Sequence, residues 1–415
     1  MAVTDEAVKV QYETYPYPER DPADEARRLV VGSPSHLLEL NHYVFAGARD
    51  FGKPFRALVA GGGTGDAAIM LAQQLADAGP GEVVYLDLSH ASRAIAEARA
   101  AARGLTNIGF HSLTIDELPG SDLGPFDYID CCGVLHHLAD PAAGLRALAA
   151  VLAPDGGMGL MLYGEYGRVG VYHVQDLLRR LGGQDDTPAE QVALTKRVLK
   201  DLPATNWLRR NDGLGDHFEG GDAGIYDLLL HPRDRAYRVP EIAELAAAAG
   251  LRLTAFVDPL RYDPDGLLSD PHLRKRQAGL GWLDRCAVAE ALAGNIRKHV
   301  FYLVHDGNLG PVVADPEDPA MVPCWHQFDP VTAAGMRPGQ PLSAEVDGLT
   351  LRAPLPTLAK TMISRVDGTR SIGAIGAELR EMNSSLDENA FMRQFGELFR
   401  AFNGFGKLFL ERPEP

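Results

Sequence analysis

A glycine-rich turn and a carboxylate that follows it are the first residues of this chain with the chemistry of a ligand site. The turn is Gly61-Gly62-Gly63-Thr64-Gly65, and it follows an apolar segment of strand character at residues 57–60. Glycine allows a tight turn and brings backbone N–H groups close to a ligand. Asp87 ends a second predicted strand 22 residues beyond Gly65, where a carboxylate accepts hydrogen bonds from both hydroxyls of a ribose. Asp87 could instead cap the next helix, but its distance from the glycine turn favours a nucleoside site.

Two polar side chains follow a later strand of the same kind. Tyr163 ends the strand, and Arg168 lies five residues further on. Ligands of open α/β sheets bind at this carboxyl edge, so Tyr163 could bind a substrate and Arg168 could hold a carboxylate. A turn with a solvated arginine is an equally good interpretation.

A second polar cluster lies between Tyr226 and Tyr237. Asp227 and His231 are four residues apart, which places them on one face if the segment is helical. A histidine oriented by an aspartate is a reasonable general base, although the two residues could equally form an ordinary pair at a helix end. No second histidine or cysteine at metal-ligand spacing accompanies them, so we expect no metal.

An alternating series of strands and helices must position these residues. Residues 67–72 predict a helix directly after the glycine turn, and residues 148–163 predict a helix, a Pro/Gly turn and a strand. A further helix fits residues 239–250, because Pro240 suits a first helical turn and Gly250 suits a C-terminal stop. Other predicted strands lie at residues 82–87, 108–113, from 126, 253–257 and 299–304.

Together these segments resemble the class I S-adenosylmethionine-dependent methyltransferases. The most specific match is the pattern FDYI…GVLHHL.DP..GL..L..VL.P.GGM.L in residues 126–160, and the resemblance covers residues 50–170 with a weaker continuation to about 305. It implies an α/β fold, a Rossmann-like seven-stranded sheet with helices on both faces, whose seventh strand runs antiparallel between the fifth and sixth. It also implies S-adenosyl-L-methionine as cofactor. One departure is Val59, which stands where the family usually has an acid two residues before the first glycine.

The resemblance implies a set of cofactor-binding residues. They are Gly61, Gly62, Gly63, Thr64, Gly65, Asp87, Leu88, Thr114, Ile115, Cys132 and Gly133. Thr114 stands where many relatives place an acid for the adenine amine, so the backbone of Thr114 and Ile115, or Asp116, could replace that contact.

The candidates for a catalytic role come from the polar clusters described above and from the family resemblance. They are His137, His231, Tyr15, Tyr163 and Arg168. His136 and His137 follow the fourth strand, where relatives face cofactor and substrate, so His137 could contact the cofactor or act as a base. The LHHL string occurs in methyltransferases with unrelated substrates, which favours the cofactor or scaffold role. A base is needed only if the acceptor atom carries a proton that must leave.

The chain divides into several predicted parts. Residues 1–50 form an N-terminal lid or cap, residues 51–305 the methyltransferase domain, residues 164–238 an insertion that supplies a substrate wall, residues 306–320 a linker, and residues 321–415 a winged-helix-like domain. In the first part, Pro16 and Pro18 impose extended backbone, and Tyr12, Tyr15 and Tyr17 present large rings. Related methyltransferases carry a similar YxxYPYP-like segment near the cofactor, so we favour a lid that excludes water over a surface strap.

The C-terminal part contains the pattern DGTRSI, and it distantly resembles the winged helix of bacterial protein-lysine methyltransferases. In its third predicted helix, at about residues 387–403, Arg393 and Arg400 stand against Glu388 and Glu397. This balance does not favour DNA binding. Docking of a protein or peptide, and dimerisation or packing, both stay open.

The overall composition limits the classes of partner that the protein can have. The 415 residues carry a formal net charge of −16, which repels phosphate backbones and argues against a nucleic-acid substrate. The four cysteines show no CxxC spacing, so neither a zinc site nor a disulfide framework is indicated. No signal core and no apolar run of about 18 residues is present, so we expect a cytoplasmic protein without a membrane partner.

The sequence therefore predicts a methyltransferase that transfers a methyl group by in-line displacement to a nitrogen or oxygen on a protein or peptide side chain. A small-molecule acceptor and a non-catalytic S-adenosylmethionine-binding or assembly protein are the alternatives, and a homodimer is left open. A nicotinamide-dependent reductase is disfavoured because it normally shows GxGxxG, whereas this chain has GGGTG.

Overall fold

The centre of the molecule is one seven-stranded sheet. In the computed structural model, which describes residues 5–183, 185–335 and 340–413, the strand order is β3-β2-β1-β4-β5-β7-β6. Strand β7 runs antiparallel between β5 and β6, and the other strands run parallel to one another. The strands are β1 (Phe55–Ala60), β2 (Gly81–Leu86), β3 (Ile108–His111), β4 (Phe126–Cys132), β5 (Leu152–Tyr163), β6 (Leu251–Phe256) and β7 (Lys298–His305). The Rossmann-like methyltransferase sheet expected from the sequence is confirmed, including the position of its antiparallel strand.

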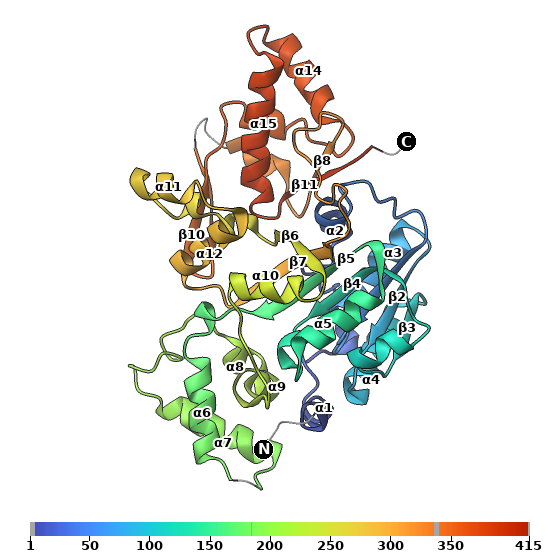
Figure 1. The fold of residues 1–415 in the computed structure, drawn as a ribbon, viewed down its shortest axis with the longest axis vertical. Helices are drawn as coiled ribbons and strands as arrows, with labels where there is room; N and C mark the ends of the chain where they lie inside the picture. Colours follow the sequence, from blue (N-terminus) through green and yellow to red (C-terminus); the bar gives the residue numbers. More distant parts are fainter. Residues whose placement is uncertain (1–4, 184, 336–339, 414–415) are drawn as a thin grey trace.

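Helices cover both faces of the sheet (Figure 1). Side chains alternate along a strand, so Leu58 and Ala60 of β1 pack into one apolar layer, and Ala57 and Val59 pack into the other. The first layer includes α5 (Pro141–Ala150), α10 (Val239–Ala247) and α12 (Trp282–Ala293); the second includes α2 (Leu37–Val44), α3 (Asp66–Ala78) and α4 (His90–Arg103). The sheet is therefore buried on both faces, so side chains that could bind a ligand must lie at the ends of its strands.

The segment between β5 and α10 forms a separate group of helices, at the lower left of Figure 1. It contains α6 (Val171–Leu181), α7 (Pro188–Asp201), α8 (Asp216–Glu219), α9 (Gly221–Ile225) and the π-helical turn η5 (Tyr226–Leu230). Its own apolar cluster joins α6 to η5. A bridge between Gly164 and Tyr237 closes the segment at its base.

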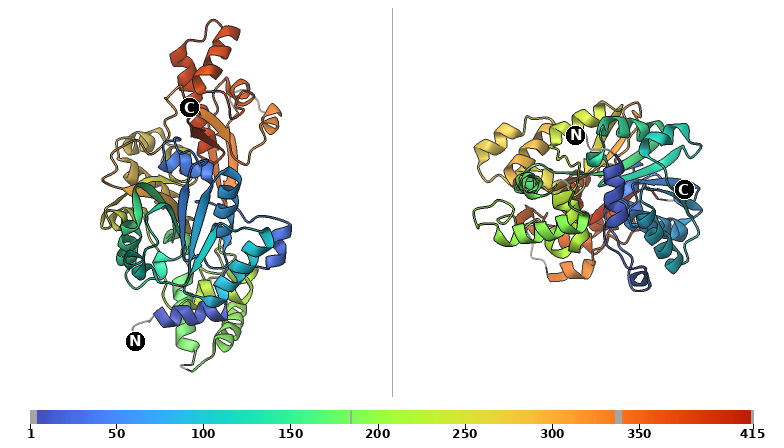
Figure 2. Two further views of the ribbon diagram at one scale, coloured as in Figure 1. Left: turned by 90° about the vertical axis from the view of Figure 1, so that its right-hand side faces the viewer. Right: turned by 90° about the horizontal axis from the view of Figure 1, so that it is seen from below.

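The N-terminal helix α1 (Asp5–Thr14) lies beside this insertion. Figure 2 shows α1 crossing the end of the molecule that the insertion forms. The helix ends at Thr14, immediately before Tyr15-Pro16, because proline disfavours helical backbone in the preceding residue. The tyrosine-rich segment is therefore helical up to Thr14 and non-helical, with bends, from Tyr15 to Pro18.

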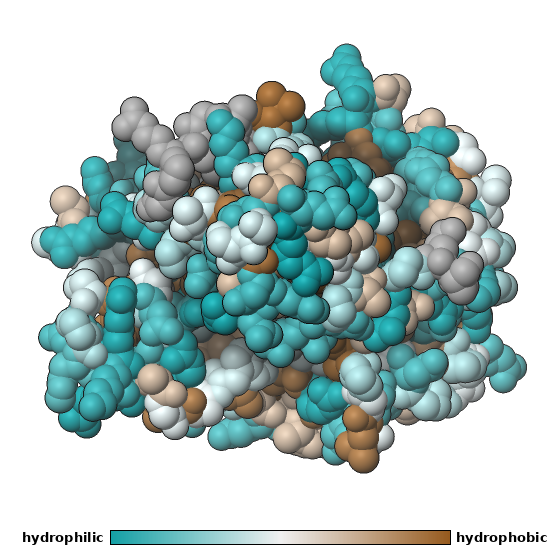
Figure 3. Space-filling model, turned by 90° about the horizontal axis from the view of Figure 1, so that it is seen from above, coloured by the Kyte–Doolittle hydropathy of each residue, from teal (hydrophilic) through white to brown (hydrophobic). Residues whose placement is uncertain are grey.

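The C-terminal part stands at the opposite end, at the top of Figure 1. Its elements are β8 (Val322–Trp325), η8 (Pro330–Gly335), β9 (Leu342–Val346), β10 (Leu349–Ala353), α13 (Ala359–Ile363), α14 (Ile372–Met382), α15 (Glu388–Asn403) and β11 (Leu408–Glu411). Strand β11 pairs with β8, which precedes the helices. Figure 3 views this end of the molecule and shows a largely hydrophilic face on which apolar side chains are scattered.

The remaining elements are short. They are η1 (Pro22–Ala26), η2 (Ile115–Gly120), η3 (Leu135–His137), η4 (Tyr166–Arg168), η6 (Pro259–Tyr262), η7 (Pro264–Gly266) and α11 (Pro271–Gln277). No helix in the described ranges combines the length and the apolarity that a bilayer crossing requires.

Helix α2 ties the C-terminal part to the sheet. Tyr43 donates a hydrogen bond to Oδ1 of Asn403 in α15 (3.1 Å), and its ring stacks on Tyr302 of β7. Residues 306–320, which the sequence suggests as a linker, lie along the same helix: the carbonyl of Val312 accepts from Ala46, and Ala314 donates to the carbonyl of His42. The two parts therefore share buried contacts.

A buried carboxyl lies in this contact layer. Glu39 accepts hydrogen bonds from the hydroxyls of Tyr302 (2.6 Å) and Ser33 (2.9 Å). Burial raises the pKa of Glu39 to about 7, because the charged form loses its hydration, although the two hydrogen bonds act in the opposite direction. The folded protein therefore prefers the protonated carboxyl.

This preference predicts a pH-dependent stability. Because the folded pKa lies above the unfolded one, the contribution of Glu39 is fully present below the unfolded pKa and is lost as the pH rises through about 7. We expect Glu39→Gln to gain about 2–3 kcal/mol in unfolding free energy over the wild type between pH 4 and pH 8. Urea unfolding at both pH values measures the difference, and Glu345→Gln, on an exposed residue of β9, is the control. Parallel pH curves for wild type and Glu39→Gln would contradict the prediction.

Candidate active site

The glycine turn joins β1 to α3 at the carboxyl edge of the sheet. The N–H groups of Gly61 and Gly62 donate to the carbonyl of Leu86 (2.8 and 2.9 Å), which fixes the turn against β2. A Cβ at Gly61 would clash with Val134, and one at Gly62 would clash with the ring of Tyr85. The absence of side chains is therefore required here, and it leaves a smooth backbone surface at the strand ends.

Asp87 organises this turn from the end of β2. Its Oδ2 accepts from the N–H of Gly63 and its Oδ1 from the N–H of Ser89, both at 2.8 Å. Burial raises the pKa of Asp87, although the backbone donors at Ser89 and Gly63 oppose the shift. Ser89, not Asp87, caps α4 by accepting from the N–H of Ser92. Since each carboxylate oxygen can accept more than one bond, Asp87 can still take a ribose hydroxyl.

We predict that Asp87→Ala weakens binding of S-adenosylmethionine by about 1–3 kcal/mol, or roughly 5- to 150-fold in Kd, the range for losing a charged hydrogen-bond acceptor. Isothermal titration calorimetry measures the change. Asp155→Ala, on an exposed residue near the start of β5, is the control and should bind as the wild type does. Equal affinity of Asp87→Ala and wild type would argue against a ribose contact.

The N-terminal segment lies directly over the glycine turn. The carbonyl of Pro18 accepts from Oγ1 of Thr64 (2.7 Å), and Arg20 pairs with Asp66 at the start of α3 (2.6 Å). The carboxylate of Glu13 accepts from the N–H groups of His90 (2.7 Å) and Ala91 (3.0 Å), which are free donors at the N-terminus of α4. These contacts hold the segment across the first turns of α3 and α4.

Other expected cofactor residues lie along the same edge. Thr114 caps η2, and both its N–H and its hydroxyl donate to Glu117, so its side chain is already engaged. Ile115 is buried beside it. Gly133 has a φ of +78° directly after Cys132, the last residue of β4. Leu88 follows Asp87 in the turn between β2 and α4.

A buried acid lies next to Val59, where the family's usual acid is missing. Asp130 of β4 is the cross-strand neighbour of Val59. Its carboxylate accepts from the hydroxyl of Ser35 (2.5 Å), and burial raises its pKa to about 6. The sequence reasoning did not single out Asp130, although a charged residue within a buried strand was a usable signal.

A second group of polar side chains gathers where α1, β5 and η5 meet. Asp227 accepts one hydrogen bond at each carboxylate oxygen, from the hydroxyls of Tyr12 (3.2 Å) and Tyr163 (3.1 Å). Burial raises the pKa of Asp227, whereas the nearby His137 acts to lower it. Asp227 lies in a π-helical turn, a distortion that is frequent at functional sites. We call Tyr12, Tyr163, Asp227, His137 and His231 the polar chamber.

The two chamber histidines differ in their available atoms. Their rings stack at 3.6 Å. Nδ1 of His137 lies 2.7 Å from the carbonyl of Arg233, which can only accept, so the proton is on Nδ1 and Nε2 keeps a lone pair. Nδ1 of His231 accepts from the N–H of Arg233, so Nε2 carries the proton. Burial lowers the pKa of both rings, so both are neutral at pH 7.

The expected pairing of Asp227 with His231 does not occur, because Asp227 is held by the two tyrosines. Arg168 also departs from expectation: its guanidinium pairs with Asp234 (2.7 Å) and lies 3.7 Å above the ring of Tyr163. The carboxylate that it holds thus belongs to this chain, and a substrate carboxylate would have to displace it. Asp234 is the partner that sequence reasoning missed.

Tyr15 is the candidate that lies outside the chamber. Its ring packs against Tyr226 at 5.4 Å, on the insertion. The structure thus brings Tyr163, His137 and His231 together, adds Tyr12 and Asp227, and leaves Tyr15 on the adjoining wall.

Several buried polar atoms in the site have no partner in the described part of the chain. They are both ring nitrogens of His136, Nε2 of His231 and Oδ1 of Asp234. Such atoms are costly unless a ligand or water satisfies them. Together with the glycine surface and Asp87, they fit a nucleoside cofactor with a polar tail and an acceptor beside it. No three His, Cys, Asp or Glu residues in the described ranges are grouped to hold a metal ion.

Comparisons with known proteins agree with this geometry. A family model described as "Methyltransferase domain" matches residues 58–158. An uncharacterised Synechococcus protein is 32% identical over 305 residues, covering 72% of this chain and 71% of that protein. A ubiquinone biosynthesis O-methyltransferase of Neisseria meningitidis is 31% identical over 87 residues, which is 21% of this chain and 37% of that enzyme.

Among solved structures, PKMT2 from Rickettsia typhi has a similar fold. Its TM-score is 0.60 at 15% identity, and the match covers 97% of this chain and 76% of that one. A second structure of that protein, in complex with AdoHcy, gives a TM-score of 0.58 and covers 91% of this chain and 75% of that one. The likeness extends over the insertion and the C-terminal part, beyond the residues that the family model matches.

Proposed function

Because this chain belongs to the class I S-adenosylmethionine-dependent methyltransferases, we propose that it methylates a nitrogen or oxygen on a protein or peptide side chain. Bound S-adenosylmethionine supplies an activated methyl group on a sulfonium that leaves readily. The chain's own residues must then hold the acceptor in line, exclude water and remove any proton from the acceptor atom.

We assign the cofactor to the glycine turn and its neighbours. Gly61 to Gly65 would present the cofactor with a turn whose glycines carry no side chains, and Asp87 would accept from the ribose. Residues 114–115 and 132–133 would line the remainder of the edge. The segment around Tyr12 to Arg20 would act as the lid, since its contacts to Thr64, Asp66 and the start of α4 already close over the turn.

Within the polar chamber, we assign proton removal to Asp227. It is the carboxylate of the chamber that no arginine pairs with directly, whereas Asp234 is engaged by Arg168. Burial raises the pKa of Asp227 towards neutrality, which makes it a better base. Nε2 of His231 would donate to the acceptor, and Nε2 of His137 would accept from it. Tyr163 and Arg168 would position Asp227, and Tyr163 would also position His136, whose ring stacks on it at 3.9 Å.

The observation that favours a protein as the methyl acceptor is an exposed apolar rim beside the chamber. Trp207 is 57% exposed and Val169, the neighbour of Arg168, is 47% exposed. The backbone of residues 207–208 packs directly on Gly170, so the two side chains come from adjoining loops. Arg210 lies over the Trp207 ring at 5.5 Å. Exposed tryptophan flanked by arginine is typical of protein-binding surfaces.

A labelling experiment tests this proposal. A lysate depleted of small molecules and a separate metabolite extract are incubated with the enzyme and methyl-labelled S-adenosylmethionine. We expect label in protein, and we expect Trp207→Ala to reduce it at least about ten-fold, as for a binding hot spot. Leu309→Ala, on an exposed residue of the loop after β7, is the control. Label confined to the metabolite extract would overturn the protein acceptor.

A small-molecule acceptor is the second candidate. It is favoured by the local match to the ubiquinone biosynthesis O-methyltransferase, which is 31% identical over 87 residues. That match covers a minor share of both chains, whereas the exposed rim lies in the insertion.

We propose that the C-terminal part, residues 321–415, presents or docks the protein acceptor.

A further inference from the structure

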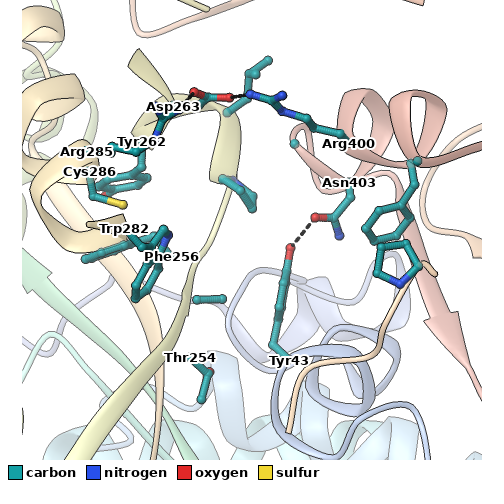
Figure 4. A pocket seen from close by; sticks show the side chains of 17 residues that line it. Tyr43, Thr254, Phe256, Tyr262, Asp263, Trp282, Arg285, Cys286, Arg400 and Asn403 are labelled. Carbon is teal, nitrogen blue, oxygen red and sulfur yellow. Dashed lines mark hydrogen bonds and ion pairs between the residues drawn. The ribbon is translucent and has the colours of Figure 1, made fainter. Parts of the chain in front are cut away.

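A cavity at the edge of the sheet lies outside the polar chamber. It has a volume of about 450 Å³, which is within the range of small-molecule pockets. It lies between edge strand β6, helix α12 and helix α15 of the C-terminal part. Figure 4 shows Phe256, Tyr262 and Trp282 on one side and Asn403 on the other, with Tyr43 and Thr254 below. None of the chamber residues lines it.

The walls of this cavity are largely aromatic. Phe256 and Tyr262 stack at 4.3 Å with an angle of 16° between their planes, and Trp282 lies 6.0 Å from Phe256. Phe399 of α15 faces them from the C-terminal part. Flat aromatic faces favour ring-bearing or extended apolar ligands.

A glycine in the middle of α15 also lines the cavity. Glycine is unfavourable in a helix interior relative to alanine. At Gly373 and Gly376 of α14, an added Cβ would press on Pro319 or Phe391, so packing explains those glycines. At Gly396 an added Cβ would meet no heavy atom within 4 Å. Within the described part of the chain, the space beside Gly396 is therefore not filled by any side chain.

The polar atoms left over at the cavity rim are donors. Arg400, whose side chain is 63% exposed, pairs through Nη2 with Asp263 and with Asp265 (3.5 Å), and its Nε and Nη1 have no partner among the described residues. The indole N–H of Trp282 likewise has no hydrogen-bond partner in the described part of the chain, and the residue is 46% exposed. Figure 4 shows Asp263 bridging Arg285 and Arg400 across the top of the cavity. A ligand head with oxygen acceptors would satisfy these donors.

We propose that this cavity is a binding site for a small aromatic acid, with its ring between the aromatic walls and its oxygens on Arg400 and Trp282. The ligand would contact both the sheet edge and the C-terminal part. This site is separate from the acceptor site, and the proposal does not depend on which acceptor is methylated.

Dye binding tests the site in the full chain, with excess S-adenosylhomocysteine present to occupy the cofactor cleft. The probes are 8-anilinonaphthalene-1-sulfonate and its neutral relative N-phenyl-1-naphthylamine. We expect saturable binding of the sulfonate by the wild type and at least about a ten-fold loss of affinity in Gly396→Phe, which fills the cavity. Gly307→Phe adds the same ring at an open, exposed glycine and should bind as the wild type does.

Two rim variants test the head group without filling the cavity. Trp282→Phe and Arg400→Gln should weaken the sulfonate several-fold and the neutral dye much less. They involve partly exposed side chains, so they remain informative if Gly396→Phe fails to fold. Equal sulfonate binding by wild type and folded Gly396→Phe would overturn the site. Equal effects of the rim variants on both dyes would overturn the acidic ligand.

Discussion

Asp227→Asn is expected to lower kcat for methyl transfer by about 10²–10⁴-fold, the usual contribution of a general base. Asparagine has the same shape and can still bond the hydroxyls of Tyr12 and Tyr163, so the chamber should keep its geometry. Cofactor affinity should change little, because Asp87 and the glycine turn are untouched. Single-turnover rates with labelled S-adenosylmethionine, together with calorimetry, separate the two quantities.

The pH profile gives this prediction a second readout. Burial raises the pKa of Asp227, and a base works only when ionised, so the rate should rise as the pH increases through that raised pKa. Asp227→Asn should lose this acid limb. Asp222→Asn, on a half-exposed aspartate of the same insertion that pairs with Lys196, is the matched control and should retain it. An acid limb that persists in Asp227→Asn would overturn Asp227 as the base.

Gly63→Val is expected to weaken cofactor binding by about 100-fold or more, because backbone strain and crowding each cost about 1–3 kcal/mol. Gly63 has a φ of +51°, and an added Cβ would lie 2.8 Å from the carbonyl oxygen of Tyr17. The turn can relieve both only by moving its N–H groups or by pushing the N-terminal segment away. Calorimetric titration with S-adenosylhomocysteine measures the loss.

Gly104→Val provides the matched control for strain. Gly104 ends α4 with a φ of +70°, so valine there is strained in the same way, but an added Cβ would meet no heavy atom within 4 Å. We expect this variant to lose stability and to keep its affinity for the cofactor. If both variants bind the cofactor equally well, the glycine turn is not the cofactor site.

Much of the sheet and of the turns at its strand ends could be predicted from local sequence patterns. The glycine turn, the carboxylate at the end of β2 and the break in helical backbone at Pro16 and Pro18 all follow from backbone preferences of a few neighbouring residues. The strand that precedes His137 and the strand that ends at Tyr163 follow from apolar runs bounded by turns. The resemblance in residues 126–160 supplied the position of β7, which no local pattern could specify.

Partners between distant side chains were not predictable in the same way. Asp227 and His231 are four residues apart, but Asp227 binds Tyr12 and Tyr163, which are 215 and 64 residues away. Arg168 binds Asp234 across the insertion, and Asp130 stands beside Val59 because β4 pairs with β1. Each partner was set by where another element packs.

The sequence alone determined the class of fold, the family, and the glycine turn and carboxylate at the strand ends, because these depend on short-range backbone geometry and on a continuous motif. Only the tertiary structure decided which histidine keeps a lone pair, which carboxylate stays unpaired by an arginine, and that a cavity remains beside Gly396. Those properties depend on burial and on contacts between segments far apart in the chain, and a burial environment exists only once the elements have packed.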